Sequence, residues 1–235
     1  PGAPEIRRVE RNLLDGELPR GTRVLPLYGE LAPDAQVVAL RPSAPGARKV
    51  VLATSIAETS LTIEGVRIVV DSGLARRSRF DPASGMSRLE TLRASVASTE
   101  QRRGRAGRLE PGVCFRVWTE EMQRQLLAAT PPEIIEADLA PLALDLACWG
   151  TSPDALAWLD PPPAPHLAQA RDLLRALDAI DDAGRATPDG RRMAALGLHP
   201  RLAHMLVRAR ALGATRAAAE LAALLTERDV ARPRP

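Results

Sequence analysis

Four short apolar runs, separated by stretches with helical periodicity, constrain the fold of this chain more than any other feature. They lie at residues 22–28, 49–54, 66–71 and 113–118. The run at residues 49–54 directs apolar side chains toward both faces, which is typical of a strand buried in a parallel sheet. Parallel strands need crossover connections, which are right-handed and usually helical. The alternation therefore predicts an α/β domain with a parallel sheet.

Two helices are predicted between the first runs. In residues 5–15, Ile6, Val9 and Leu13 recur at helical spacing, and the Asp-Gly pair that follows ends the pattern. Residues 33–40 form a shorter pattern with a proline in the first turn, where the missing N–H costs least.

Residues 76–97 do not fit the alternation of strands and helices. A turn signal at residues 81–85, Asp-Pro-Ala-Ser-Gly, separates apolar residues on its two sides. A β-hairpin and a plain surface loop both explain this pattern, and the residues alone leave the choice open.

Beyond residue 120 the strand signal fades and helices are predicted. Helical patterns occur at residues 138–149, 153–159, 164–180, 200–212 and 214–227. Residues 178–188 have the turn-rich pattern of a small two-stranded wing. The second part of the chain is therefore expected to be mostly α.

Residues 101–108, Gln-Arg-Arg-Gly-Arg-Ala-Gly-Arg, are the strongest candidate for chemistry. Gln101, Arg105 and Arg108 have the i, i+4, i+7 spacing of one helical face. Guanidinium groups presented together suit a phosphoryl group and would stabilise charge that develops during its transfer. The alternative is a solvated basic face or a general nucleic-acid patch without a catalytic role.

Composition excludes several other classes of protein. The net charge is +3, and Lys49 is the only lysine. Cys114 and Cys148 lie far apart, which argues against a disulfide framework or a zinc site and suits a reducing cytoplasm. No apolar run approaches the roughly 20 residues of a membrane span, so no membrane partner is expected. The chain begins with Pro1 and ends in an Arg-Pro repeat, and we expect it to be a piece of a longer protein.

Two segments together resemble a known family. Residues 49–63, where an apolar run breaks into a hydroxyl-rich loop, and residues 101–108 resemble motifs V and VI of the DEAH-box helicases of superfamily 2. Softer matches at residues 108–114 and 158–163 resemble the bacterial HrpB-type members. The resemblance implies a second RecA-like domain at residues 1–120, with a β-hairpin inserted at about 76–97. It also implies a winged-helix-like domain at 121–195 and the start of a helical ratchet-like bundle at 196–235.

The resemblance also implies which residues act on ATP. Gln101 would orient the attacking water or touch the γ-phosphate, and Arg105 and Arg108 would be arginine fingers. The residues expected to contact the nucleotide are Ser60 near the γ-phosphate, Thr62, Glu64 near the ribose and Leu40 near the adenine. On local grounds alone, the alternative for Ser60 is a helix cap, and a plain surface glutamate explains Glu64 better than a nucleotide contact does.

Three residues are implied as nucleic-acid contacts. Thr54, at the end of a buried run, would touch the RNA backbone, as would Arg76 and Arg77. The local alternative for Thr54 is helix capping. Arg102 and Arg103 fall on other helical faces and are expected to be structural or generally electrostatic.

The resemblance implies a fragment of an ATP-dependent RNA helicase. The sequence contains neither a GxxxxGK[ST] phosphate loop nor an Asp-Glu-Ala-His box, which ATP and Mg²⁺ normally need. A missing N-terminal RecA-like domain is therefore expected to complete the site and supply the Mg²⁺ ligands, and the fragment should be inactive alone. No metal site is expected, because the three histidines make no ligand constellation. Single-stranded RNA is the expected partner. The alternatives are a non-catalytic nucleic-acid-binding module with a helicase fold and a DNA-directed superfamily 2 enzyme.

Overall fold

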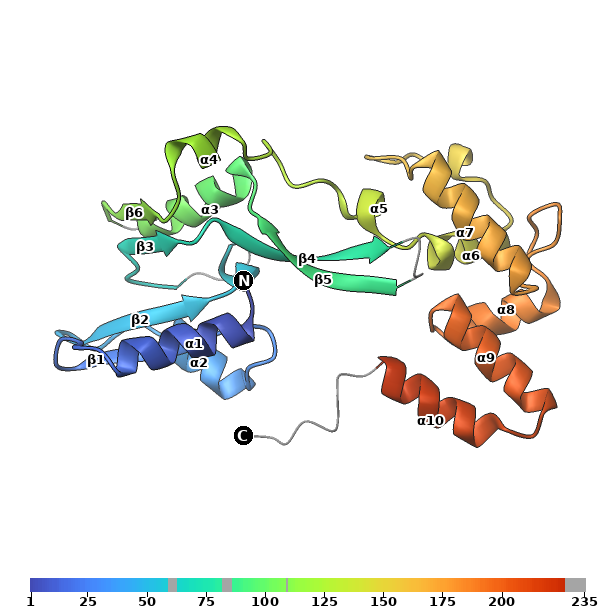
Figure 1. Cartoon of the computed structure of the whole chain (residues 1–235), viewed down its shortest axis with the longest axis horizontal. Helices are drawn as coiled ribbons and strands as arrows, with labels where there is room; N and C mark the ends of the chain where they lie inside the picture. Colours follow the sequence, from blue (N-terminus) through green and yellow to red (C-terminus); the bar gives the residue numbers. More distant parts are fainter. Residues whose placement is uncertain (59–62, 82–85, 109, 227–235) are drawn as a thin grey trace. The chain divides into compact units, whose positions relative to one another are not determined.

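The computed structural model describes residues 1–58, 63–81, 86–108 and 110–226 (Figure 1). The chain divides into two compact units. The first consists of Pro1–Arg79 with Arg88–Pro131, and the second of Phe80–Ser87 with Pro132–Pro235.

The first unit alternates helices and strands, as the apolar runs predict. Its elements are α1 (Ala3–Leu14), β1 (Thr22–Leu27), α2 (Pro33–Leu40), β2 (Arg48–Ala53), the 3₁₀ turn η1 (Ser55–Ala57), β3 (Ile68–Asp71), α3 (Val96–Ala106), β6 (Val113–Arg116) and α4 (Glu120–Arg124). The four predicted strands are therefore confirmed. The helix predicted at residues 5–15 begins earlier, because the Glu5 carboxylate accepts a hydrogen bond from the Gly2 N–H at 2.9 Å and supports the first turn.

Both strand pairs of this unit are parallel, as predicted. β1 pairs with β2 from Thr22↔Arg48 to Leu27↔Ala53, and β3 pairs with β6 from Ile68↔Val113 to Asp71↔Arg116. Among the described residues these are separate two-stranded sheets, so the single sheet that we expected is not seen there.

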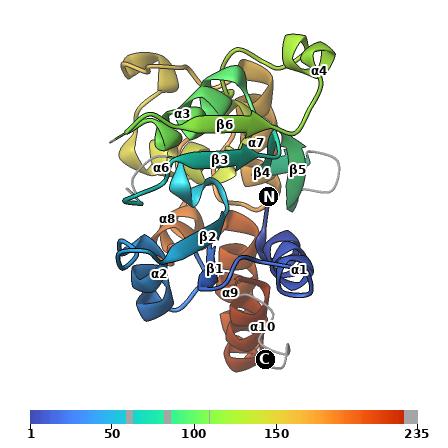
Figure 2. The ribbon, with the colours of Figure 1, turned by 90° about the vertical axis from the view of Figure 1, so that its left-hand side faces the viewer.

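Helices cover these strand pairs unequally. α1 and α2 lie on opposite sides of the β1–β2 pair, and α3 packs against β3 and β6 (Figure 2). Val69 and Asp71 of β3 are at least half-buried, whereas their neighbours Ile68 and Val70 are exposed. One face of the β3–β6 pair is thus packed against α3, and the other carries exposed apolar side chains.

A close approach between α3 and β6 requires a glycine. A Cβ added at Gly112 would lie 2.1 Å from the carbonyl oxygen of Ala106, the last residue of α3. Gly112 therefore lets the chain turn back beneath the helix end and enter β6.

Residues 74–81 and 86–93 form the two strands of the β-hairpin that the family resemblance implies. Its strands are β4 (Leu74–Asp81) and β5 (Met86–Arg93), which pair as a two-stranded sheet. Arg79 and Glu90 approach to 3.8 Å across the pair. The predicted turn at residues 81–85 falls, from residue 82 on, outside the described residues.

The second unit is helical. Its elements are α5 (Glu133–Glu136), α6 (Ala140–Trp149), the 3₁₀ turn η2 (Pro153–Ala155), α7 (Ala164–Ala176), α8 (Pro188–Ala195), α9 (Pro200–Ala211) and α10 (Thr215–Thr226). Its core gathers Leu144, Leu174, Met193 and Ala203 from four helices. The helix predicted at residues 153–159 is only the turn η2, since the chain becomes extended at Leu156.

The predicted wing is reduced to one bridge. Ile180 and Ala186 pair antiparallel, and the turn between them is fixed by Asp181, whose carboxylate accepts a hydrogen bond from the Arg185 N–H at 2.8 Å. The expected boundaries at residues 120 and 195 stay a prediction. In the described part of the chain, no helix is long and apolar enough to cross a membrane.

Candidate functional site

Helix α3 carries the arginine-rich segment, and its ends are set by local chemistry. Ser95 precedes the helix and caps it, since its hydroxyl oxygen accepts a hydrogen bond from the Ser98 N–H at 3.2 Å. The helix ends at Ala106. Gln101 and Arg105 are therefore one turn apart on the helix, but Arg108 lies beyond its end. The prediction of one helical face shared by all three residues is wrong for Arg108.

Arg105 and Arg108 nevertheless come together at a small surface depression. It is lined by Ile63, Gly65, Val66, Arg67, Arg105, Arg108 and Glu110. The segment that leads into β3 and the end of α3 thus share one wall, and three of its side chains are guanidinium groups. Gln101 is exposed and is not among these lining residues. Arg67 forms an ion pair with Glu110 at 3.6 Å within this lining, and the guanidinium groups of Arg105 and Arg108 fit an anion such as a phosphate.

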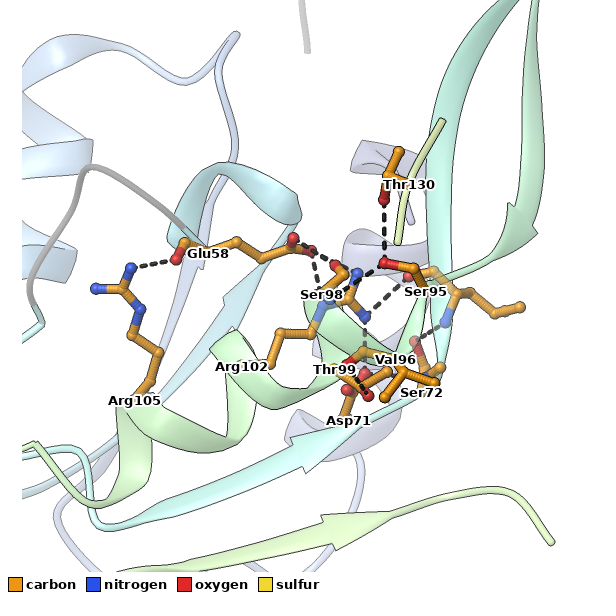
Figure 3. Close-up of polar contacts among 12 residues, drawn as sticks. Glu58, Asp71, Ser72, Ser95, Val96, Ser98, Thr99, Arg102, Arg105 and Thr130 are labelled. Carbon is orange, nitrogen blue, oxygen red and sulfur yellow. Dashed lines mark hydrogen bonds and ion pairs between the residues drawn. The ribbon is translucent and has the colours of Figure 1, made fainter. Parts of the chain in front are cut away.

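Arg102 occupies the centre of a polar network (Figure 3). Its Nε donates to Glu58 Oε1 at 2.7 Å, and its Nη1 donates to Asp71 Oδ1 at 2.7 Å and to the Leu74 carbonyl at 3.1 Å. The side chains of Arg102, Glu58 and Asp71 are only 15%, 14% and 2% exposed. Arg102 is thus structural, one of the two roles expected from the sequence.

The charge of Arg102 is secured by its surroundings. Burial by itself would lower the pKa of its guanidinium, but the hydrogen bonds and negative charges of Asp71 and Glu58 outweigh burial and raise that pKa. The network is therefore a charged cluster that joins α3, the end of β3 and the turn after β2.

Glu58 contacts two further residues of α3 (Figure 3). Its Oε2 accepts a hydrogen bond from the Ser98 hydroxyl at 2.6 Å, and its main-chain carbonyl accepts one from Arg105 Nη2. Sequence reasoning did not single out Glu58 or Asp71. Asp71 was the easier of the two to find, because a carboxylate at the end of an apolar run is unusual and needs a partner.

Thr54 lies where β2 ends, as predicted. Its N–H donates to the Leu27 carbonyl at 3.2 Å, and its own carbonyl accepts from the Ala57 N–H at 3.3 Å. The residue occupies the N-cap position of η1, but its side chain makes no capping hydrogen bond to that turn. Capping by the hydroxyl, the local alternative for Thr54, is thus not supported.

Arg76 and Arg77 leave β4 in opposite directions. Successive side chains of a strand point to opposite faces, and Arg76 is exposed whereas Arg77 is half-buried. The Arg76 guanidinium lies against Gly2, where an added Cβ would be 2.6 Å from Arg76 Nη1. The two arginines do not form a single basic surface.

The residues expected at the nucleotide are only partly described. Ser60 and Thr62 lie outside the described residues. Glu64 is exposed in the turn before β3, and Leu40 is half-buried at the last position of α2. Lys49 Nζ donates to the carbonyls on either side of Leu40, those of Ala39 at 3.1 Å and Arg41 at 2.7 Å.

Two of the three histidines have hydrogen-bond partners within the second unit. His199 Nε2 lies 2.8 Å from Asp138 Oδ2, and His204 Nδ1 lies 2.9 Å from the Leu177 carbonyl. In the described part of the chain, no group of three or more potential metal-ligating side chains occurs.

Two family comparisons identify the kind of region to which this fold and site belong. Residues 3–110 match the helicase conserved C-terminal domain, and residues 170–198 match the winged-helix helicase associated domain, HA2. The chain thus contains a helicase conserved C-terminal domain, followed by a segment of the HA2 winged-helix type. The expected fold class, a RecA-like domain followed by a winged-helix part, is confirmed.

Individual relatives narrow the family. The chain is 46% identical to the ATP-dependent RNA helicase HrpB of Escherichia coli (strain K12) over 228 residues, which cover 97% of this chain and 28% of that protein. It is 40% identical to the pre-mRNA-splicing factor ATP-dependent RNA helicase prp22 of Schizosaccharomyces pombe over 229 residues, or 96% and 20% of the two chains.

Solved structures agree with these relatives. The crystal structure of the E. coli DExH-box NTPase HrpB matches with a TM-score of 0.89 at 45% identity, covering 98% of this chain and 28% of that one. A crystal structure described as the E. coli DEAH/RHA helicase HrpB matches with a TM-score of 0.92 at 43% identity, covering 100% and 31%. The chain belongs to the HrpB-type DEAH-box helicases, and it spans less than a third of the length of these relatives.

Proposed function

We propose that this chain is the C-terminal helicase region of an ATP-dependent RNA helicase, which couples ATP hydrolysis to movement along or unwinding of RNA. The observation that carries the proposal is the depression where Arg105 and Arg108 meet. Both relatives described above are named ATP-dependent RNA helicases, which supports the same activity.

In this proposal Arg105 and Arg108 stabilise the negative charge that develops on the transferred γ-phosphoryl group. Gln101, on the same helix but exposed, positions the attacking water when the site closes. Leu40 and Glu64, with Ser60 and Thr62, contribute to nucleotide binding. An N-terminal RecA-like domain supplies the Mg²⁺ ligands and the opposite wall, so this region alone is inactive.

The RNA contacts in this proposal come from Thr54, at the end of β2, and from the arginines of β4. Of the latter, Arg76 is the better candidate because it is exposed, whereas Arg77 leaves the other face of the strand. Contacts of this kind neutralise backbone phosphates and do not read the base sequence. A cytoplasmic location suits the two free cysteines.

The proposal is tested with the full-length protein. Arg105→Ala is expected to lower the RNA-stimulated ATPase rate on the order of 10³-fold or more, because the transition state loses a cationic partner, while RNA binding persists. Arg124→Ala is the matched control, since Arg124 forms an exposed pair with Glu120 at 3.9 Å.

Two outcomes would favour other functions. A full-length protein that binds RNA but hydrolyses no ATP, or an Arg105→Ala variant with an unchanged rate, would indicate a non-catalytic binding module. Stronger stimulation by DNA than by RNA of the same sequence would favour a DNA-directed enzyme. Equal stimulation would not, because contacts restricted to the phosphates do not sense the 2′-hydroxyl.

A further inference from the structure

Glu58 links the turn that follows β2 to the helix that carries Arg105. We propose that Glu58 is a positioning residue, which transmits the contact between the turn and RNA to the placement of Arg105. This inference rests on the proposed function, because it assigns a task to a residue between the proposed RNA contact and the proposed arginine finger.

The turn is short enough to move as one piece. Thr54 precedes η1 and Glu58 follows it, and main-chain hydrogen bonds close the turn at both ends. The Ala57 N–H donates to the Thr54 carbonyl at 3.3 Å, and the Glu58 N–H donates to the Ser55 carbonyl at 2.9 Å. A displacement of Thr54 by an RNA backbone is therefore passed to Glu58 through a single 3₁₀ turn.

Glu58 forms hydrogen bonds with one face of α3. Its partners there are Ser98, Arg102 and Arg105, which have the i, i+4, i+7 spacing of a single helical face. The carboxylate bonds the first two, and the main-chain carbonyl bonds the third. Glu58 thus holds both the body of α3 and the side chain of the proposed arginine finger.

The helix has a second anchor that does not involve Glu58. Arg102 Nη1 also donates to Asp71 Oδ1, which in turn accepts a hydrogen bond from the Gly73 N–H at 2.9 Å. Loss of the Glu58 carboxylate therefore leaves α3 attached to the end of β3. Because this attachment persists, substitution at Glu58 should loosen the turn from the helix without unfolding the unit.

The test compares basal and RNA-stimulated ATPase activity of the full-length protein with Glu58→Ala and Glu58→Gln. Glu58→Ala removes the carboxylate, and Glu58→Gln keeps its shape but loses its charge, so it serves if the alanine variant does not fold. Glu120→Gln, in the exposed pair with Arg124, is the matched control.

We expect the Glu58 variants to lower kcat of the RNA-stimulated reaction about 10- to 100-fold, as small misplacements of catalytic groups do. The basal rate should fall less than the stimulated rate and the KM for ATP should stay close to the wild-type value, so the ratio of stimulated to basal rate falls. RNA binding should persist, because the backbone contacts themselves are intact.

Other results would overturn the inference in distinguishable ways. If the basal and stimulated rates fall by the same factor and the melting temperature also falls, Glu58 only stabilises the fold. If the ratio of stimulated to basal rate equals that of the wild type, Glu58 transmits nothing, although the proposed function stands. If the wild-type protein itself shows no RNA-stimulated ATPase activity, both the proposed function and this role of Glu58 are wrong.

Discussion

At the scale of single residues, Arg102 shows how one side chain can join distant parts of the sequence. Its partners Glu58 and Asp71 lie 44 and 31 residues away in the chain. Two poorly exposed carboxylates that approach each other would repel, and the guanidinium between them removes that cost. Arg103, the next residue, is different, because it forms an exposed pair with Glu100 at 2.7 Å.

This contrast gives a prediction for two adjacent arginines. Arg102→Ala leaves two carboxylates poorly exposed and without their shared cation, so it should destabilise the first unit by about 3 kcal/mol. Arg103→Ala should cost less than about 1 kcal/mol, because exposed ion pairs contribute little. Urea unfolding of each variant, monitored by hydrogen exchange of the α3 amides, measures the change in stability. Equal losses of stability for the two substitutions would contradict the network.

At the scale of elements, Lys49 fastens α2 to the neighbouring strand. Its ammonium group in β2 donates to the carbonyls of Ala39 and Arg41 at the end of the helix. A cation at this position satisfies carbonyls that lack partners in the helix and complements its dipole. Burial lowers the pKa of the amine, and the nearby Glu64 partly counteracts this lowering.

Lys49→Met tests this anchor. Methionine keeps the apolar stem but cannot donate, so α2 should lose about 1 kcal/mol of local stability. Faster hydrogen exchange of the α2 amides, with unchanged exchange in α3, is the expected result. Arg23→Met is the matched control, because Arg23 is the exposed register partner of Lys49 in β1. An equal change in both variants would show that the anchor contributes nothing.

The elements also show what the sequence predicts well and what it misses. The strands were found because apolar runs bounded by turns have few other solutions. The end of α3 was not predicted correctly, because residue spacing alone does not show that the chain leaves the helix at Gly107. This error placed Arg108 on the helix. The Glu58 network was also missed, since a contact across 44 residues leaves no local pattern.

At the scale of the whole molecule, each unit is stabilised by contacts between residues far apart in the chain. In the second unit Asp138 joins the starts of two helices. Its Oδ1 accepts from the Ala140 N–H at 2.8 Å at the start of α6, and its Oδ2 lies 2.8 Å from His199, the residue that precedes α9. Burial would raise the pKa of Asp138, but the hydrogen bonds from His199 and Ala140 outweigh it and lower the pKa.

The sign of this shift predicts an acid-sensitive contact. A lowered carboxyl pKa adds stability that is fully present above the ordinary value and is lost as the pH falls through the lowered one. Asp138→Asn should therefore be less stable by about 1 to 2 kcal/mol at neutral pH, and this deficit should shrink on acidification.

The stability of the second unit is measured by urea equilibration at several pH values, followed by pulsed hydrogen exchange of α6 and α9 at one common pH. Asp154→Asn, at an exposed position in η2, is the control and should match the wild type. A deficit of Asp138→Asn that stays constant with pH would show that the carboxylate charge is not involved.

Lys49 also gives this region a chemical handle. It is the only primary amine on a side chain in these 235 residues, and its nitrogen is engaged by two carbonyls. An acylating reagent would therefore mark one side chain of this region, and only when that nitrogen is released. The yield of the acylated peptide, read by mass spectrometry, would report how often the end of α2 opens in the intact protein.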